Sequence, residues 1–350
     1  MASAYVGIDL HRRRTVIVTM DAVGDVSSSV RIDNDPLALA REVAKAGVDA
    51  DVVLEATYGW YWAVDVLQQL GVRVHLAHPL GLAWGHRRRK DDFADARDLA
   101  DLFRLGRLPE AWIAPPALRE LREVVRHRTK LVFVRSGFKA QVHAVLAKEG
   151  VRVPMTDLFG NAGRMLLNQV ELAPAYRFRV QSLLRLIEAS AVEIRDAERW
   201  VRTALDGHRG FEAIQAIGGV GETIAAIFVA EIGDIDRFER PAQLCSWAGL
   251  TPRHRESDTT VVRGRITKQG STLVRFAAVE AAMRVRAGHP LYPGFESIAA
   301  RRGRRIARVA MARRILELAF YGLRDGHIRF LDDHRSDDTH SVDTESADAA

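Results

Sequence analysis

The stretch Tyr5-Val6-Gly7-Ile8-Asp9 is a short apolar run that ends in a carboxylate, and Asp51-Val52-Val53-Leu54-Glu55 repeats this arrangement. Runs rich in β-branched residues predict strands. An ionised side chain is rarely tolerated inside a strand without a partner. We therefore expect Asp9 and Glu55 to point out of a sheet at the ends of two strands. A hairpin-edge or capping role for Asp9 is the alternative.

A third acidic element is Lys90-Asp91-Asp92-Phe93-Ala94-Asp95-Ala96-Arg97-Asp98-Leu99-Ala100, which predicts a helix from about Asp92 to Leu105. A spacing of three residues places Asp92 and Asp95 on one face of that helix. The same acids could instead stabilise the helix N-terminus through the macrodipole, a role for which Asp91 and Asp98 compete.

Together these elements supply four carboxylates in the first hundred residues. Hard cations such as Mg²⁺ take oxygen ligands, and pairs of them clamp the reacting oxygens in many nucleases. The pattern predicts divalent-metal chemistry on phosphodiesters. The expected ligands of one or two Mg²⁺ ions are Asp9, Glu55, Asp92 and Asp95.

The order of the elements around these acids predicts a fold class. Three strands joined by turn signals come first, and helices then alternate with strands. The expected elements are strands 5–9, 15–20 and 26–32, helix 36–46, strand 51–55, helix 60–70 and strand 73–77. This is the order of the ribonuclease-H-like α/β fold, an analogy that by itself does not determine function.

Composition limits the classes of protein to consider. The chain has 350 residues, 47% apolar and 27% charged, enough for two or three domains of an ordinary soluble protein. No secretory signal or membrane span is visible, so a cytosolic location is expected. The single cysteine, Cys245, excludes an intramolecular disulfide and a multi-cysteine zinc cluster, and its neighbours predict a buried helical position.

Charge favours a polyanionic partner. The net charge is +6, and residues 332–350 hold seven acids against Arg335, which leaves about +12 on the rest of the chain by subtraction. Arginines cluster at 12–14, 87–90 and 301–305, and such clusters suit phosphate backbones. Solvated helix faces also give charge runs, so the inference to nucleic acid rests on the clusters and the acids together.

The second half of the chain is mainly helical in pattern. Apolar residues recur at helical spacing over 115–150 and 174–205, which predicts two long antiparallel helices that act as a spacer or dimer contact. The turn Ile217-Gly218-Gly219-Val220-Gly221 resembles a helix-hairpin-helix element, in which glycine lets the backbone approach a phosphate. A purely structural connection is the alternative.

Residues 250–260 form a polar stretch flanked by arginines, which predicts a loop. Ser257 lies in it, although a serine in a loop is usually a cap or turn former. Helices are expected from about Ser271 to Arg286 and from Arg304 to Leu323. The acidic, Ser/Thr-rich tail after Leu331 is expected to be disordered.

These pieces, in this order, resemble the DEDD-type insertion-sequence transposases, the family numbered one hundred and ten. Val6-Gly7-Ile8-Asp9, Leu54-Glu55-Ala56-Thr57 and Lys90–Ala96 resemble its acidic motifs. In the second half the similar motifs are Ile217–Gly221, Glu231–Asp234, Arg237-Phe238, Gly249–Pro252 and Ile266–Gly270.

The resemblance implies a RuvC-like domain over 1–112, a coiled-coil linker over 113–208 and a C-terminal transposase domain over 209–330, which the acidic tail 331–350 follows. It implies that Ser257 is a nucleophile that forms a covalent phosphoserine with DNA. It also implies a guide RNA encoded by the element, DNA partners at the element ends and the target, a homodimer or homotetramer, and a nucleoid-associated cytoplasmic location.

The residues expected to contact nucleic acid are basic residues and glycines of these motifs. They are Arg88, Arg89, Lys90, Gly219, Gly221, Arg253, Arg255, Arg263, Arg265 and Lys268.

This chain departs from the family pattern at three positions. Asp258 follows Ser257 where the family often has glycine, Asp91 replaces a threonine, and Gly218 replaces a proline. Three alternatives therefore stay open beside the transposase: a hydrolytic nuclease or junction resolvase using water, a nucleic-acid-binding relic without activity, and a sugar-kinase-like ATPase. The last lacks a second glycine-rich phosphate loop, and the basic charge disfavours it.

Overall fold

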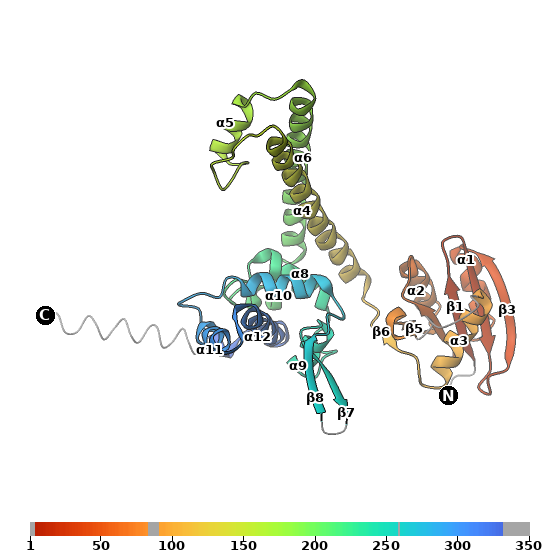
Figure 1. The fold of residues 1–350 in the computed structure, drawn as a ribbon. Helices are drawn as coiled ribbons and strands as arrows, with labels where there is room; N and C mark the ends of the chain where they lie inside the picture. Colours follow the sequence, from red (N-terminus) through yellow and green to blue (C-terminus); the bar gives the residue numbers. More distant parts are fainter. Residues whose placement is uncertain (1–3, 83–90, 258–259, 332–350) are drawn as a thin grey trace. The chain divides into compact units, whose positions relative to one another are not determined.

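A computed structural model describes residues 4–82, 91–257 and 260–331. The chain divides into two compact units, an N-terminal unit of residues 1–114 and a C-terminal unit of residues 115–350 (Figure 1). The predicted tail, 332–350, lies outside the described residues. Among the helices of the described ranges, none is both long and apolar enough to cross a membrane.

The N-terminal unit is built on a six-stranded sheet in the order β3-β2-β1-β4-β5-β6. Strands β1, β2 and β3 pair antiparallel, β4 and β5 run parallel to β1, and the short β6 returns antiparallel to β5. The strands are β1 (Tyr5–Leu10), β2 (Arg14–Met20), β3 (Val26–Asp33), β4 (Asp51–Glu55), β5 (Arg73–Ala77) and β6 (Glu110–Ala111). The helices are α1 (Pro36–Ala44), α2 (Trp60–Gln69), η1 (Pro79–Gly81) and α3 (Asp92–Arg104).

Alternation along the strands divides the side chains of the sheet between two cores. One face packs against α1 and α2 and includes Val6, Ile8, Val52 and Leu54. The other face carries Gly7, Val16, Val18 and Val53 and packs against α3. Every strand and helix predicted between residues 5 and 105 is present, whereas β6 is too short to leave a pattern in the sequence.

Gly7 lets α3 approach the sheet at backbone distance. A Cβ built on Gly7 would lie 1.8 Å from the carbonyl oxygen of Ala96, far inside any tolerated contact. Ala96 and Ala100 are fully buried beside it, so small side chains on the helix match the missing side chain on the strand. This close packing places the first turn of α3 next to the end of β1.

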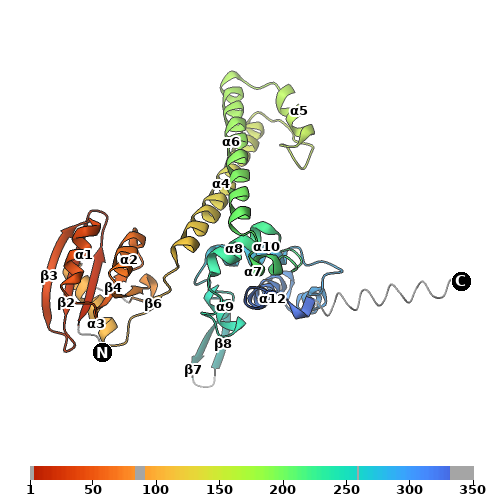
Figure 2. The same ribbon diagram turned by 180° about the vertical axis from the view of Figure 1, so that it is seen from behind.

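The C-terminal unit begins with two long helices, α4 (Pro116–Lys148) and α6 (Pro174–Ala204), that pack side by side (Figure 2). They run in opposite directions, as predicted for 115–150 and 174–205, and α5 (Asn161–Gln169) lies between them in the chain. Their ends near Leu121 and Val201 share one core with the helices that follow. That a coiled coil forms stays a prediction.

The remaining helices of this unit are α7 (Arg209–Ile214), α8 (Glu222–Ile232), α9 (Pro241–Trp247), α10 (Thr272–Ala282), α11 (Tyr292–Arg302) and α12 (Arg304–Asp325). Among them, α8 packs against α7 and α10, and α12 packs against α7, α9, α10 and α11. Helix α8 is buried from Ala225 to Ile232. The C-terminal half is mainly helical, as expected, but α10 ends earlier than predicted, and α5 and α11 were not predicted.

The predicted loop over 250–260 is wrong. Residues Pro252–Ser257 form β7, which pairs antiparallel with β8 (Thr260–Ile266). β7 is polar throughout after Pro252, and the apolar residues of β8 do not alternate with its arginines, so the pattern that marks a half-buried strand is missing. Backbone pairing between the two strands, which the sequence pattern does not indicate, forms this hairpin.

Burial makes Cys245 an unreactive thiol. It lies on α9 with no exposed surface, its Sγ is 3.6 Å from the Arg313 carbonyl oxygen, and burial raises the pKa of the thiol to about 12. This confirms the buried helical position predicted for it.

Gly7→Ala tests the contact between β1 and α3. Because the added Cβ meets backbone rather than a flexible side chain, we expect α3 to be displaced, with a loss of stability on the order of 1–3 kcal/mol or more. Hydrogen exchange of α3 and β1 in the full chain measures it. The control is Gly137→Ala in α4, where a Cβ meets open space and alanine is expected to stabilise the helix by about 0.4–1 kcal/mol. Equal exchange in both variants would contradict the contact.

The Cys245 thiol should titrate only on unfolding, because the thiolate is the reactive form. At pH 8 a disulfide reagent is expected to leave the native chain unmodified and to label one thiol per chain in denaturant. Rapid stoichiometric labelling of the folded chain would show that α9 does not bury the sulfur.

Candidate functional site

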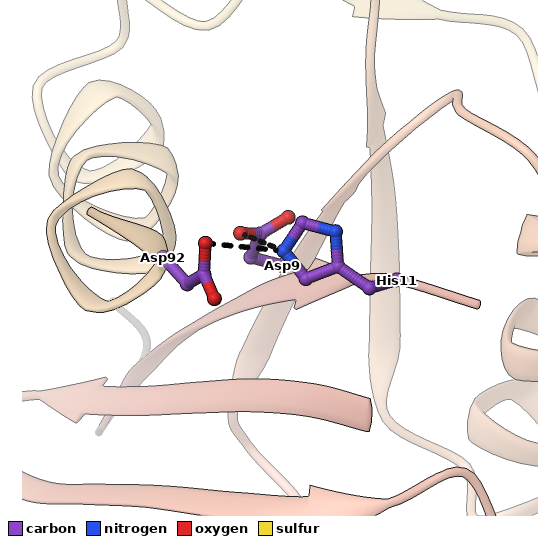
Figure 3. Close-up of side chains that lie close together, drawn as sticks. All are labelled: Asp9, His11 and Asp92. Atoms are coloured by element: carbon purple, nitrogen blue, oxygen red, sulfur yellow. Dashed lines mark ion pairs between the residues drawn. The ribbon is translucent and has the colours of Figure 1, made fainter. Parts of the chain in front are cut away.

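The end of β1 and the first turn of α3 bring two of the predicted acids together around a histidine. His11 Nε2 lies 3.0 Å from Asp9 Oδ2 and 3.3 Å from Asp92 Oδ1 (Figure 3). The potential ligand atoms of these three residues all lie within 4.8 Å of one another. Figure 3 shows both carboxylates directed toward the same ring edge.

Two atoms at the centre of this group have no hydrogen-bond partner among the described residues. Asp9 Oδ2 and His11 Nε2 are both buried, and although 3.0 Å apart they are not aligned for a hydrogen bond. Buried polar atoms are normally satisfied, and unsatisfied ones call for an explanation such as an ion. Here the donor set is two carboxylates and an imidazole, which are all common metal ligands.

Burial raises the pKa of the Asp9 carboxyl above its ordinary value. The nearby His11 opposes this rise, while the negative charges of Asp92 and Asp95 add to it. The ionised form of Asp9 is therefore destabilised in the chain alone. A cation placed between these carboxylates would relieve both burial and repulsion.

Asp95 and Glu55 belong to the same face of the N-terminal unit. Asp95 is buried on α3, one turn from Asp92. In the parallel pair β1–β4, Ile8 lies beside Leu54, so Asp9 and Glu55 follow in neighbouring positions on the face that α3 covers. The four acids are thus placed around one end of β1 and β4. Their role as ligands stays a prediction.

The acids of α3 have separate positions. Asp91 is the N-cap, and its side chain accepts a hydrogen bond from the Phe93 N–H at 3.1 Å. This satisfies a free amide of the first turn and gives Asp91 a structural role. Asp92 Oδ2 lies 3.5 Å from Arg31 Nη2 on β3, which leaves Oδ1 facing His11.

Sequence reasoning missed His11 and Arg31. His11 follows Asp9 by two residues, and side chains two residues apart on a strand lie on the same face. This spacing could have indicated His11 as a neighbour of Asp9. Arg31 on β3 has no such signal, because its proximity to Asp92 comes from the sheet order. His11 is held by the turn itself: its N–H donates to Arg14 O at 3.0 Å and its carbonyl accepts from Asn34 Nδ2 at 2.7 Å.

In the C-terminal unit, Ser257 is the last residue of β7 and pairs with Thr260 of β8. Asp258, the residue that departs from the family pattern, lies outside the described residues. The base of this hairpin is firmly held. A Cβ on Gly270 would lie 1.7 Å from Trp247 O, and Arg275 Nη1 donates to Ala248 O at 2.9 Å and to Gln269 O at 3.0 Å.

The predicted nucleic-acid contacts fall partly on this hairpin. Arg253, Arg265 and Lys268 are exposed there, and Lys268 has a positive φ of 58°, which is unusual for a residue other than glycine. Arg255 and Arg263 are in β7 and β8. Arg88, Arg89 and Lys90 lie outside the described residues.

The glycine turn lies between α7 and α8. Gly219 has a φ of +90°, and a Cβ there would lie 2.6 Å from Ala281 O, so packing requires glycine at this position. Gly221 has open space around its Cβ position. Glu222, in the first turn of α8, is paired with Arg202 at 2.7 Å. The turn is therefore a tightly packed helix connection, and its contact with phosphate stays a prediction.

Comparison with known proteins assigns both halves of the chain to transposases. A DEDD-type model described as "Transposase" matches residues 6–149, and a model described as "Transposase IS116/IS110/IS902 family" matches residues 211–292. The first match contains Asp9, Glu55, Asp92 and Asp95, and the second contains Ser257.

Individual relatives agree with these models. The candidate transposase y4qE of Sinorhizobium fredii is 32% identical over 196 residues, 56% of this chain and 48% of that protein, so the match spans about half of the relative. The transposase for insertion sequence element IS1111A of Coxiella burnetii is 23% identical over 282 residues, 79% of this chain and 76% of that protein. The transposase for element IS1328 of Yersinia enterocolitica is 23% identical over 66% of this chain and 69% of its own length.

Since models of one family match across both units, the chain belongs to the IS116/IS110/IS902 family of transposases.

Proposed function

We propose that this chain is the transposase of an insertion sequence and recombines DNA by phosphodiester strand exchange that requires a divalent metal. The observation that carries the proposal is the position of Asp9 and Asp92, with the unsatisfied Asp9 Oδ2 between them. Such a site suits a cation and a bound phosphate better than a neutral small molecule. The sheet order β3-β2-β1-β4-β5, with its first three strands antiparallel, supports a ribonuclease-H or RuvC-like fold.

The four acids Asp9, Glu55, Asp92 and Asp95 would hold the metal, with Mg²⁺ as the expected ion. When bound, the metal would polarise the scissile phosphate and stabilise charge that develops on its oxygens. Packing of α3 on β1 fixes the carboxylates before substrate arrives, so little rearrangement is needed. Arg31 neutralises the outer oxygen of Asp92 and keeps the other oxygen directed inward.

Ser257 is the proposed nucleophile. Its Oγ forms the new bond to phosphorus as the bond between phosphorus and the 3′ oxygen breaks, and the proton lost by the serine is balanced by the proton gained by the leaving 3′ hydroxyl. The position of Ser257 at the end of a strand of a basic hairpin supports this role. We further propose that the serine and the acids act on one phosphate within an oligomer.

The proposed partners are DNA at the element ends and the target, a guide RNA from the element, and further copies of this chain in a homodimer or homotetramer. The charge of about +12 outside residues 332–350 supports polyanionic partners. Exposed apolar side chains on the long helices, among them Phe133 and Phe178 with 60% and 70% exposure, support a contact between copies. A guide RNA would supply sequence choice by base pairing.

A hydrolytic nuclease is a second candidate, because all four acids lie in the N-terminal unit and could activate water without Ser257. It would release free 5′-phosphate ends instead of a covalent adduct. A relic that binds nucleic acid without cleaving it would form neither product.

Ser257→Ala is expected to abolish covalent protein–DNA adducts and to leave nucleic-acid binding within about twofold, since one hydroxyl contributes little to binding a long polyanion. Adducts are measured by denaturing gel with labelled element-end DNA. The control is Ser297→Ala, an exposed serine on α11, which should form adducts normally. Adducts in Ser257→Ala would remove the serine from the mechanism, and free 5′ phosphates in both variants would favour the nuclease.

Asp9→Asn is expected to abolish strand exchange at any Mg²⁺ concentration and to stabilise the metal-free N-terminal unit. The pKa of the Asp9 carboxyl is higher in the folded chain than in the unfolded chain, so the folded state loses stability as the pH rises and this carboxyl ionises. At pH 7 the buried negative charge is therefore unfavourable. A neutral amide at this position removes the cost of burying that charge. Hydrogen exchange of β1–β4 in a chelator measures this effect.

Asp21→Asn is the matched control for that substitution. Three backbone N–H groups, from Val23, Gly24 and Asp25, donate to Asp21 and lower the pKa of its carboxyl. Its ionised form therefore stabilises the fold above the ordinary pKa, and the same substitution should weaken the unit at pH 7. A metal-free Asp9→Asn chain less stable than the native chain would contradict the assignment of Asp9 as an uncompensated carboxylate.

A further inference from the structure

His11 is an imidazole inside a group from which the sequence predicts oxygen ligands alone. Its side chain is 40% exposed, yet its Nε2 atom is buried and faces Asp9 and Asp92. Hydrophobic packing therefore does not explain the position of this ring. The nitrogen that a metal would use is the one turned toward the carboxylates.

Hydrogen bonds of the turn fix the backbone of His11. The His11 carbonyl accepts from Asn34 Nδ2, and Asn34 Oδ1 accepts from the hydroxyl of Thr15, a fully buried residue, at 2.6 Å. The His11 N–H donates to Arg14 O, which closes the turn between β1 and β2. These bonds do not involve the carboxylates, so the backbone of His11 keeps its position independently of Asp9 and Asp92.

The spacing of the donor atoms fits one octahedral cation. Adjacent ligands at about 2.1 Å from an octahedral ion lie about 3.0 Å apart. The two separations at His11 Nε2 are 3.0 Å to Asp9 and 3.3 Å to Asp92. The same two separations also fit an ion pair between a protonated His11 and the carboxylates, which an experiment with a bound metal ion distinguishes from ligation.

On the basis of the metal centre proposed above, we infer that His11 is itself a metal ligand through Nε2 and makes this centre prefer Mn²⁺ and similar transition ions over Mg²⁺. Magnesium is best served by oxygen ligands and retained water, whereas an imidazole nitrogen favours first-row transition ions. Removing the ring should therefore weaken Mn²⁺ binding more than Mg²⁺ binding. The acids would continue to hold either ion.

The test uses the full chain and Mn²⁺ as the probe, without nucleic acid. Free Mn²⁺ has a paramagnetic resonance signal that is lost on binding, and competition with Mg²⁺ gives the ratio of the two affinities. Electron spin-echo spectroscopy detects a nitrogen-14 nucleus coordinated to the bound Mn²⁺. The native chain should show this coupling at substoichiometric Mn²⁺.

His11→Ala should lose the coupling, with Mn²⁺ affinity falling by about tenfold or more and Mg²⁺ affinity falling less. His11→Asn, which offers an amide oxygen instead of nitrogen, should lose the coupling while retaining Mg²⁺ binding. The control is His78→Ala, an exposed histidine of the same unit that lies outside the group, and it should keep the native spectrum.

Two results would overturn the inference, and they are distinguishable. Mn²⁺ bound by the native chain without nitrogen coupling would show that His11 is not a ligand, while the acidic metal centre would stand. Failure of the native chain to bind either ion would remove the metal centre and with it the proposed function. The native spectrum decides the first case even where a variant does not fold.

Discussion

The backbone contact between Gly7 and α3 is the interaction on which the candidate metal centre depends. Asp9 and Asp92 are far apart in the chain, and they meet only because α3 lies close enough to β1 for the Ala96 carbonyl to occupy the space of a missing side chain. The buried Ala96 and Ala100 keep the helix at this distance. A larger residue on either surface would move the first turn of α3 and separate the carboxylates. Close packing of α3 on the sheet therefore determines the geometry of the candidate site as well as the fold.

The sequence predicts the N-terminal unit well because its elements carry local signals. Apolar runs mark β1, β4 and β5, and Pro36 and Asp91 mark the starts of α1 and α3. The β7–β8 hairpin has neither signal, since arginines and other polar residues occupy both of its strands. Contacts at the base of the hairpin join residues far apart in the chain, and a window of sequence does not contain that information.

The residues of the candidate site also fall into two groups, those that the sequence indicates and those that only the folded structure brings together. The four acids are visible because a carboxylate at the end of an apolar strand is locally unusual. Arg31 and His11 are ordinary residues until the sheet places β3 and the turn after β1 beside α3. The hydrogen bonds of Asn34, which orient His11, join residues whose proximity exists only in the folded sheet.

The electrostatics of the candidate site leave one carboxylate, Asp9, without full compensation. A fully paired network around Asp9 would remove its unsatisfied oxygen, but it would also occupy the atoms that a cation needs. Arg31 neutralises one oxygen of Asp92 and leaves the central atoms open. The raised pKa of the Asp9 carboxyl has a local cause, since burial and the negative charges of Asp92 and Asp95 both disfavour its ionised form.

The β7–β8 hairpin, which contains Ser257, is held mainly at its base. Two strands without a covering layer are only marginally ordered on their own, so the hairpin must take its rigidity from its base. There Gly270 fits against Trp247 and the Arg275 guanidinium binds the carbonyls of Ala248 and Gln269. These contacts hold the base of the hairpin against α9 and α10. On the proposal that Ser257 is the nucleophile, we expect the acids to be preformed before substrate binds and Ser257 to be positioned when nucleic acid engages the arginines of β7 and β8.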